Sequence, residues 1–194
     1  MNNPLRTPED YELFLYTLTD KFPSVRHSTI TFVRKGTSLA RVVGELCFDH
    51  EIRLVVRERI LYHRLPAIID WYGYEVWQGN QKLYWYDSQP HPDDPSLQST
   101  HPHHKHILPD MKHHRIPAPE MSFTQPNLPT LIRDIESFLK RIDVETQGNS
   151  SLRLLSTYCE IEESGTQGTS YSVLVKQKMI ALNIVLNQYD INVA

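Results

Sequence analysis

Hydrophobic side chains recur at helical spacing in two segments of the chain. After Thr7 and Pro8, which are typical of a helix start, the apolar residues fall three or four positions apart as far as residue 21. The same spacing returns over residues 128–142, directly after Asn127, a favoured N-cap residue. The sequence therefore predicts helices over residues 8–21 and 128–142, each with one apolar side that other elements must cover.

Between these two helices, β-branched and aromatic residues form short runs. The runs are separated by residues that favour turns, and Gly79-Asn80 joins two aromatic runs at hairpin distance. The predicted fold class is α+β, with a curved, largely antiparallel sheet that the two helices cover. We expect a meander of five strands, over residues 29–34, 39–48, 52–60, 68–77 and 82–86.

The chain divides near residue 147, where a polar, glycine-containing segment is typical of a linker. We expect residues 1–146 to form one α+β domain, since 194 residues with 40% hydrophobic content suffice for one sizeable core. Residues 150–194 form a C-terminal extension in this prediction. Its apolar segments fit helix and strand equally, and we interpret it as a dimerisation element or a docking segment for a partner protein.

Aromatic residues dominate the last two predicted strands. Because side chains alternate along a strand, both faces of the sheet should carry aromatic rings there. Core packing and protection of the sheet edge is one interpretation, and aromatic residues favour strands in any case. The other interpretation is a platform on which nucleic acid bases stack, with Tyr84 and Tyr86 as substrate contacts.

The charge balance excludes one class of nucleic-acid-binding protein. A formal net charge of −3 and a pI near 6.4 argue against a generally positive surface, although a local basic patch remains open. The chain has no run of about 18 apolar residues, and its N-terminus has no apolar run after a basic segment. We expect a cytoplasmic protein that makes no membrane contact.

Seven of the ten histidines lie between Trp85 and Arg115, in a stretch interrupted by prolines. Imidazole changes protonation near neutral pH and is also the commonest metal ligand, so a cluster of histidines has few physical uses. Alternation in an extended segment places His104 and His106 on one face. We therefore expect the chemistry of this protein in this stretch.

One use is general acid and base catalysis. Cleavage of RNA through its own ribose hydroxyl needs a base, an acid and a cation that stabilises the crowded phosphorane. His104 and His106 can act as base or acid, His91 as the opposite member, Lys105 as the phosphate stabiliser and Asp87 as the residue that orients an imidazole. This chemistry requires no cofactor.

Two further cations, Lys112 and Arg115, lie nearby in the sequence and are candidates for holding the phosphate of the substrate. Three alternatives remain open. A solvated polar loop explains any single histidine well, but explains seven of them poorly. A metal site built from imidazoles and a carboxylate would suit zinc, nickel or manganese, although no helical or paired-cysteine ligand spacing is present. A non-enzymatic module that binds protein or nucleic acid is the third.

Several motifs follow one another along the chain. They are GELCF and LVVRERI in the predicted meander, then YWYDSQPHP, then HPHHKHI before the second predicted helix. This arrangement resembles the TumE-type toxin components of bacterial and archaeal toxin–antitoxin pairs over residues 28–142.

The resemblance implies a small α+β protein, an antitoxin partner with a helix-turn-helix, and growth arrest when that partner is missing. It also implies a site, without assigned roles, at the motif positions Asp87, Pro90, His91, His104, Lys105 and His106. We therefore expect the toxin of a toxin–antitoxin pair, acting as a metal-independent ribonuclease. The alternatives are the non-enzymatic binding module and a metal-dependent hydrolase. RNA and a second copy of the chain are further expected partners.

Overall fold

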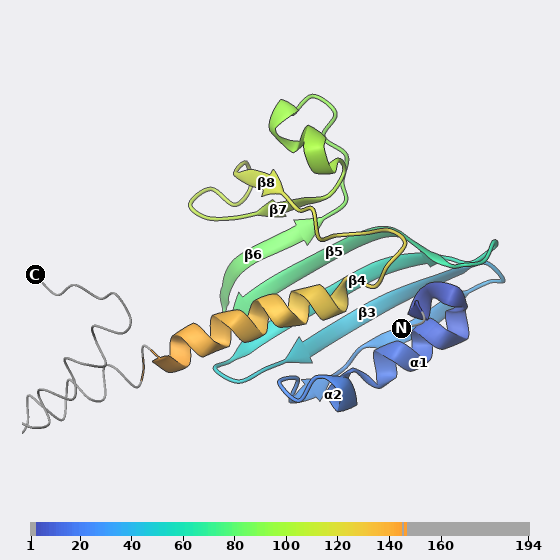
Figure 1. The fold of residues 1–194 in the computed structure, drawn as a ribbon, viewed down its shortest axis with the longest axis horizontal. Coiled ribbons are helices and arrows are strands. Elements are labelled where there is room, and N and C mark those ends of the chain that lie inside the picture. Colours follow the sequence, from blue (N-terminus) through green and yellow to red (C-terminus); the bar gives the residue numbers. More distant parts are fainter. Residues whose placement is uncertain (1–2, 145, 147–194) are drawn as a thin grey trace, which may run out of the picture. The chain divides into compact units, whose positions relative to one another are not determined.

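The structure is a computed structural model that describes residues 3–144 and 146. The predicted C-terminal extension over residues 150–194 lies outside the described residues. The chain begins with the 3-10 turn η1 (Pro4–Arg6), α1 (Pro8–Tyr16) and α2 (Leu18–Lys21), continues into a sheet, and returns in a helix over residues 128–144 (Figure 1). The α+β class predicted from the sequence is confirmed.

Eight antiparallel strands form one open sheet with the order β1-β3-β4-β5-β6-β7-β8, and β2 also pairs with β3. The five predicted strands are present within two residues of the predicted bounds, and three short strands were not predicted. The strands are β1 (His27–Ser28), β2 (Thr31–Lys35), β3 (Leu39–Cys47), β4 (Ile52–Leu61), β5 (Ile68–Gln78), β6 (Gln81–Asp87), β7 (His104–His106) and β8 (Arg115–Pro117).

The two faces of the sheet differ in composition. Along β4, every second side chain from Ile52 to Ile60 is buried, whereas Arg57 and Arg59 between them are exposed. The apolar sides of α1 and of the 128–144 helix pack on the buried face, where they join one core cluster (Figure 1). Among the described residues, no helix lies on the other side, which we call the open face.

A polar network in the core joins the helices to the sheet. Tyr11 of α1 and Tyr74 of β5 each donate a hydrogen bond of 2.6 Å to the Glu58 carboxyl, and Asn127 donates to the Tyr74 hydroxyl at 3.1 Å. Glu58 is only 2% exposed. Burial raises the pKa of Glu58 to about 7, although the two hydroxyl donors act in the opposite direction.

The first helix differs in part from its prediction. Thr7 caps α1 as expected, since its hydroxyl accepts the Asp10 N–H at 3.1 Å. The predicted helix over residues 8–21 is divided at Thr17, whose hydroxyl donates to the Leu13 carbonyl at 2.8 Å. Because the Thr17 hydroxyl bonds a carbonyl of the preceding turn, the helix breaks at this residue although the apolar pattern continues through it.

Asn127 directly precedes the second helix, as predicted, but its side chain bonds the preceding turn and not the first helical turn. Its Oδ1 accepts the Ser122 N–H at 2.8 Å, and its amide donates to the Ser122 carbonyl and to Tyr74. Only the backbone carbonyl of Asn127 accepts the N–H groups of the first helical turn. The side chain instead satisfies a buried turn that brings the chain from the sheet to the helix.

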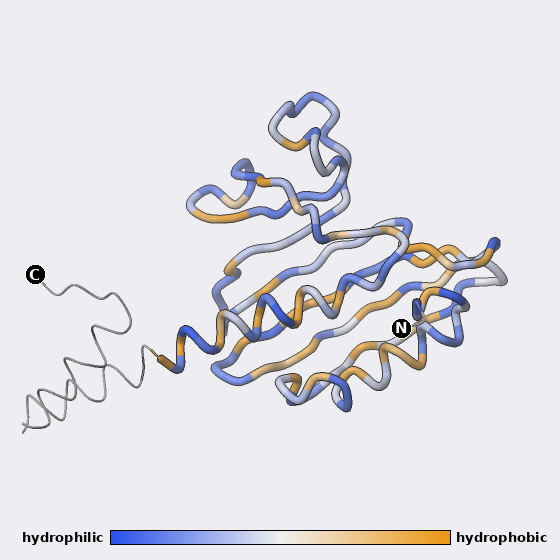
Figure 2. The backbone as a smooth tube through the Cα atoms, in the orientation of Figure 1, coloured by the Kyte–Doolittle hydropathy of each residue, from blue (hydrophilic) through white to orange (hydrophobic). Residues whose placement is uncertain are grey.

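The histidine-rich stretch extends the sheet. From Asp87 the chain leaves β6, passes through the 3-10 turn η2 (Pro95–Thr100) and comes back as β7, which pairs with β6, while β8 pairs with β7. Figure 2 shows this stretch as mostly hydrophilic, in contrast to the central strands. Within the described part of the chain, no helix is both long and apolar enough to cross a membrane.

Candidate functional site

The pairing of β6 with β7 places three functional side chains on the open face. Asp87 lies directly opposite His104, and Trp85 lies opposite His106. Residues opposite each other in an antiparallel pair point to the same side of the sheet, and so do alternate residues along one strand. Asp87, His104 and His106 therefore converge, and Lys105 points to the helix-covered face.

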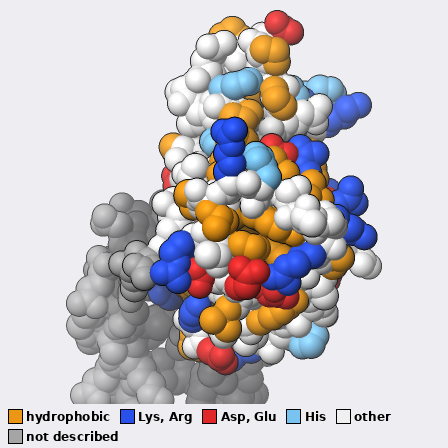
Figure 3. All heavy atoms as spheres, turned by 90° about the vertical axis from the view of Figure 1, so that its right-hand side faces the viewer, with side chains coloured by type: hydrophobic (Ala, Val, Ile, Leu, Met, Phe, Trp, Pro, Cys, Tyr) orange, Lys and Arg blue, Asp and Glu red, His pale blue; other side chains and the backbone are white. Residues whose placement is uncertain are grey.

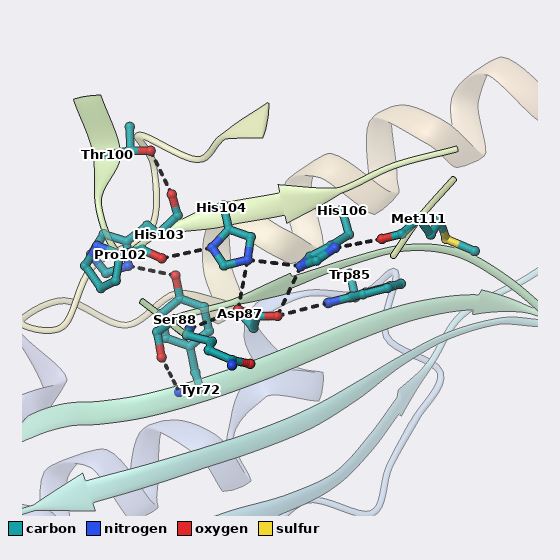
Figure 4. Close-up of polar contacts among 11 residues, drawn as sticks. Tyr72, Trp85, Asp87, Ser88, Thr100, Pro102, His103, His104, His106 and Met111 are labelled. Atoms are coloured by element: carbon teal, nitrogen blue, oxygen red, sulfur yellow. Dashed lines mark hydrogen bonds and ion pairs between the residues drawn. The ribbon is translucent and has the colours of Figure 1, made fainter. Parts of the chain in front are cut away.

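The three side chains form a compact group, in which the two histidines are buried and Asp87 is half-buried (Figure 4). His104 Nε2 lies 3.0 Å from Asp87 Oδ1, and His106 Nε2 lies 3.3 Å from Asp87 Oδ2. The two Nε2 atoms are 3.0 Å apart. His104 is 1% exposed and His106 is 4% exposed. These two imidazoles are therefore withdrawn from solvent, with the same ring nitrogen of each directed at the carboxylate.

A second layer of contacts fixes the two imidazoles. Nδ1 of His104 lies 3.0 Å from the Pro102 carbonyl oxygen, and Nδ1 of His106 lies 2.7 Å from that of Met111. A carbonyl oxygen can only accept, so each Nδ1 carries the proton. The rings of Trp85 and His106 are stacked, with centroids 4.0 Å apart. Both histidines thus have a defined orientation and tautomer.

The carboxylate is held in the same way. The Trp85 indole N–H donates to Asp87 Oδ2 at 3.1 Å, and the Gln89 backbone N–H donates to Oδ1 at 2.9 Å. Burial alone would raise the pKa of Asp87, but hydrogen bonds from His104, His106 and Gln89 outweigh it and lower this pKa. Asp87 is therefore ionised at neutral pH.

The environment of His104 has the complementary effect. Burial acts to lower the pKa of His104, but the hydrogen bonds to Asp87 and to the Pro102 carbonyl outweigh it, so the pKa is raised. The negative charge of Asp87 thus attracts a cation at the Nε2 side of the imidazoles.

His91 lies on the outer side of this group. Its ring meets the ring of His104 edge-on, with centroids 4.9 Å apart, and donor atoms of Asp87, His91 and His104 all lie within 4.8 Å of one another. Neither ring nitrogen of His91 has a hydrogen-bond partner among the described residues. Burial, and then the charge of Arg115, lower the pKa of His91. His91 is therefore a neutral imidazole with free nitrogens.

Arg115 adds an unpaired cation. In β8 it lies directly opposite His106, so its side chain starts on the open face. Its Nε is buried, with no hydrogen-bond partner in the part of the chain that the structure describes. A buried donor without an acceptor is energetically costly and uncommon in folded proteins. Arg115 thus brings an unsatisfied donor next to His106.

The open face continues from the site across the sheet. Arg57, Gly73, Asp87 and His104 lie opposite one another in successive strands, from β4 to β7. Gly73 has no side chain, and the Trp71 ring lies over it. A Cβ added at Gly73 would meet this ring at 3.5 Å, an ordinary contact. The site therefore adjoins a surface that carries an arginine and a 39% exposed tryptophan.

Comparison with protein families gives one finding. The family described as Toxin TumE matches residues 15–139. The chain belongs to the TumE toxin family. Comparison with curated proteins and with solved structures gave no significant match. Membership confirms the resemblance found in the sequence, identifies the chain as the toxin component of a toxin–antitoxin system, and implies an antitoxin partner.

In this TumE family member, three of the predicted site residues lie away from the histidines. Lys105 Nζ is 3.3 Å from Asp134 Oδ2 of the 128–144 helix and 3.9 Å from the centre of the Tyr84 ring. Tyr84 and Tyr86 also donate to Asp134. Lys105 and Tyr86 line a pocket of about 450 Å³ next to this helix. Strand alternation separates Lys105, Tyr84 and Tyr86 from His104 and His106, so the structure does not bring the predicted phosphate stabiliser to the imidazoles.

The remaining histidines have other surroundings. His103 Nδ1 lies 2.8 Å from the Tyr72 hydroxyl, and the two rings are stacked. Figure 3 shows several histidine side chains at the upper end of the face it presents, with Lys or Arg side chains beside them. Among the histidine, lysine and arginine side chains of the stretch, the exposed ones are His101, Lys112, His113 and His114. The structure therefore gathers Asp87, His91, His104, His106 and Arg115, and leaves Lys112 outside.

Sequence reasoning did not identify Trp85 and Gly73 as part of the site. Trp85 was interpreted only as one of several strand aromatics. The signal was available, because a residue two positions before Asp87 in a strand shares its face. The position of Gly73 opposite Asp87 depends on strand register, and no local feature of the sequence indicates it.

Proposed function

We propose that this toxin is a ribonuclease whose reaction takes place at the histidine site, defined as Asp87, His91, His104, His106 and Arg115. One observation carries the proposal. An imidazole with free nitrogens and an arginine with an unpartnered donor lie next to a buried carboxylate–imidazole group. Phosphodiester cleavage needs a proton acceptor and a cation for the phosphate oxygens, and these two residues supply them.

In this proposal, Arg115 binds the scissile phosphate through its guanidinium donors. His91 takes the proton from the ribose 2′-hydroxyl, the 2′-oxygen forms a bond to phosphorus, and the bond from phosphorus to the 5′-oxygen breaks. Protonated His91 then gives its proton to the leaving 5′-oxygen. The products are a 2′,3′-cyclic phosphate and a 5′-hydroxyl end. In this form the reaction requires no metal, as the sequence predicted.

The geometry modifies the roles that the sequence suggested for the other residues. His104 and His106 are too deeply buried to exchange protons with a substrate directly. We propose that they and Asp87 set the charge and position of the surroundings of His91. Arg115, rather than Lys105, is the proposed phosphate stabiliser, since Lys105 is paired with Asp134 on the opposite face.

RNA is the proposed substrate because of the surface that adjoins the site. The Trp71 ring, which lies over Gly73 and is 39% exposed, offers a face near Asp87 on which a base can stack. Arg57, in the same row, offers a second cation, although Glu75 pairs with it at 2.7 Å. Single-stranded nucleic acid fits such a combination of aromatic and basic groups better than a small metabolite does.

The test compares two double variants that each remove two imidazoles. Wild type, His104→Ala/His106→Ala and His113→Ala/His114→Ala are expressed without antitoxin, and growth and total RNA integrity are followed. We expect arrest and RNA fragmentation in the wild type and in the exposed-loop control, and neither in the buried-site variant. Purified protein should leave cyclic phosphate ends on a labelled oligonucleotide. Arrest with intact RNA would refute the ribonuclease.

The non-enzymatic binding module remains the second candidate, because the same face could hold a partner without turnover. It predicts that His91→Ala weakens binding of RNA and that no product forms with any variant. For the partners, we propose a helix-turn-helix antitoxin and, through residues 150–194, a homodimer. Copurification with the antitoxin, and light scattering of the chain with and without residues 150–194, test these two proposals.

A further inference from the structure

Within the histidine site, the Nε2 atoms of His104 and His106 face each other and the Asp87 carboxylate. Because both Nδ1 atoms carry protons that are donated to backbone carbonyls, each neutral ring presents a lone pair at Nε2. These two lone pairs lie 3.0 Å apart and face the carboxylate of Asp87. Two lone pairs and a negative charge repel one another at such distances. A cation between them, either a proton or a metal ion, is required for this arrangement to be stable.

We propose that Asp87, His104 and His106 bind a divalent first-row transition-metal ion such as Zn²⁺. The two Nε2 atoms lie 3.0 Å apart, and the Asp87 carboxylate places Oδ1 at 3.0 Å from that of His104 and Oδ2 at 3.3 Å from that of His106. For tetrahedral zinc with bonds of about 2.0–2.1 Å, neighbouring donors lie about 3.3 Å apart. The separations between these donors are therefore close to those that the ion requires.

The surroundings of the three donors are typical of a metal site. Metal-binding histidines commonly donate their other ring nitrogen to a backbone carbonyl, as His104 does to Pro102 and His106 does to Met111. Ligating carboxylates are likewise held by hydrogen bonds, as Asp87 is by Trp85 and Gln89. The donors are preorganised by separate elements, β6 and β7, and would not need to rearrange when an ion binds.

The chemistry of the donors restricts the ion. Two imidazoles and one carboxylate, without sulfur, suit zinc, manganese, cobalt or nickel, and are poor ligands for magnesium or calcium, which prefer oxygen. Three protein ligands leave an open position, the arrangement typical of catalytic rather than structural zinc sites. A donor atom of His91 lies within 4.8 Å of those of Asp87 and His104, so His91 can contact a water or a phosphate oxygen in that position.

An ion in this position would act as a Lewis acid toward the phosphate that Arg115 holds. This use of the ion rests on the proposed function, whereas binding of the ion does not. His91 remains the group that moves protons, because it is not one of the three proposed ligands.

Metal binding to the full-length chain is the test. The protein is treated with a chelator, dialysed, and titrated by calorimetry with Zn²⁺, Mn²⁺, Co²⁺ or Ni²⁺ alone, and the bound metal is then quantified by mass spectrometry. We expect one tight equivalent for at least one ion, and a change in the visible absorption of the Co²⁺ form. His104→Ala/His106→Ala should lose more than the roughly 10–100-fold in affinity that removal of an outer-shell partner costs.

The control is His113→Ala/His114→Ala, which removes the same number of imidazoles from the exposed loop and should leave the tight equivalent unchanged. Asp87→Asn, which preserves the shape of the side chain, should also weaken binding, and its circular dichroism shows whether the fold is intact. The proposal is overturned if no ion binds tightly, or if the buried-site and exposed-loop double variants bind alike.

The two proposals fail in different ways. A bound ion without RNA cleavage overturns the ribonuclease and supports the metal site. Cleavage of RNA by a protein that binds no ion tightly in the titration supports the ribonuclease and overturns the metal site, and the cation between the imidazoles is then a proton.

Discussion

Two carboxylates, the buried Glu58 and the half-buried Asp87, lie on opposite faces of the same sheet and have contrasting surroundings. On the helix-covered face, Glu58 accepts hydrogen bonds from two tyrosine hydroxyls, and burial raises its pKa to about 7. On the open face, Asp87 faces two imidazoles and an indole, and its pKa is lowered. Neutral donors allow the Glu58 carboxyl to bind a proton, whereas the imidazoles keep Asp87 charged.

The two clusters differ in whether their polar groups are satisfied, which separates the one that supports the fold from the one that the proposed reaction uses. The Glu58 network is closed, since Tyr11, Tyr74 and Asn127 all have partners within it. The group around Asp87 is open at its edge, where His91 and Arg115 have unpartnered polar atoms among the described residues. Unsatisfied polar groups next to a charged buried centre are a common property of functional sites.

The largest effect on activity is expected at Arg115, on the open face. Arg115→Met removes the proposed phosphate contact, and the rate of RNA cleavage should fall on the order of 10²–10³-fold, as when one electrostatic stabiliser of a transition state is removed. The stability of the protein should not decrease, because the Nε of Arg115 has no partner to lose. Initial rates on a labelled oligonucleotide, together with urea unfolding, measure the two effects. Unchanged cleavage would remove Arg115 from the site.

The second effect is on stability and concerns Glu58, in the closed network on the helix-covered face. The pKa of Glu58 is about 7 in the folded state and near 4.5, its ordinary value, in the unfolded state. The folded state therefore holds the proton more tightly, so stability is highest below about pH 4.5 and falls as pH rises through 7. By the usual conversion of pKa shifts, the loss is roughly 3 kcal/mol.

Glu58→Gln should remove this part of the pH dependence, because the amide stays neutral and can still bond both tyrosines. The free energy of unfolding of wild type and variant, measured in urea between about pH 5 and about pH 8, gives the difference as a function of pH. Other titrating groups affect both proteins equally and cancel. A difference that does not grow with pH would show that Glu58 is charged in the folded protein.

A smaller effect is expected at the surface next to the site. Gly73→Val should lower the efficiency of cleavage by about tenfold, because the branched side chain presses on the Trp71 ring and displaces the proposed stacking surface, whereas valine itself suits a strand. Gly73→Ala is the matched control, since its Cβ makes only an ordinary contact with Trp71. Full activity of both variants would mean that the substrate does not cross this part of the sheet.

The smallest effect is expected for Lys105→Met. It removes a partly exposed ion pair with Asp134, worth about 0–1 kcal/mol, on the face away from the histidines. Cleavage should change by less than about twofold, well below the general range for catalytic groups. A large loss of activity with an intact fold would instead support the assignment made from the sequence, in which Lys105 stabilises the phosphate.

The comparison also explains how far the sequence could be interpreted. The long strands β3, β4 and β5 were predicted within a few residues, because alternation and turn residues agree over nine or more positions. The strands β7 and β8 have three residues each and contain histidine or proline, so local propensity says little, and pairing with β6 stabilises them. Thr17 and Asn127 show the same limit, since their hydrogen bonds depend on neighbours that propensity does not describe.

For the site, the stretch that carries it could be predicted, but not the division of its residues between two faces. His104 and His106 were grouped correctly by strand period, and the same period should have excluded Lys105 between them. Arg115 was a candidate because it lies near the histidines in the sequence. Its place next to His106 follows from the β7–β8 pairing, which requires three-dimensional information.

The pairing of β7 also makes the arrangement of the site depend on the number of residues in this strand. His104 and His106 lie on the open face and Lys105 faces the 128–144 helix. Shifting β7 by one position would therefore exchange the side chains on its two faces. One residue inserted between Pro102 and His104 could be absorbed by the preceding loop, but one inserted inside β7 could not. A toxin gene could therefore be silenced by a single inserted codon there, with the core of its product still folded.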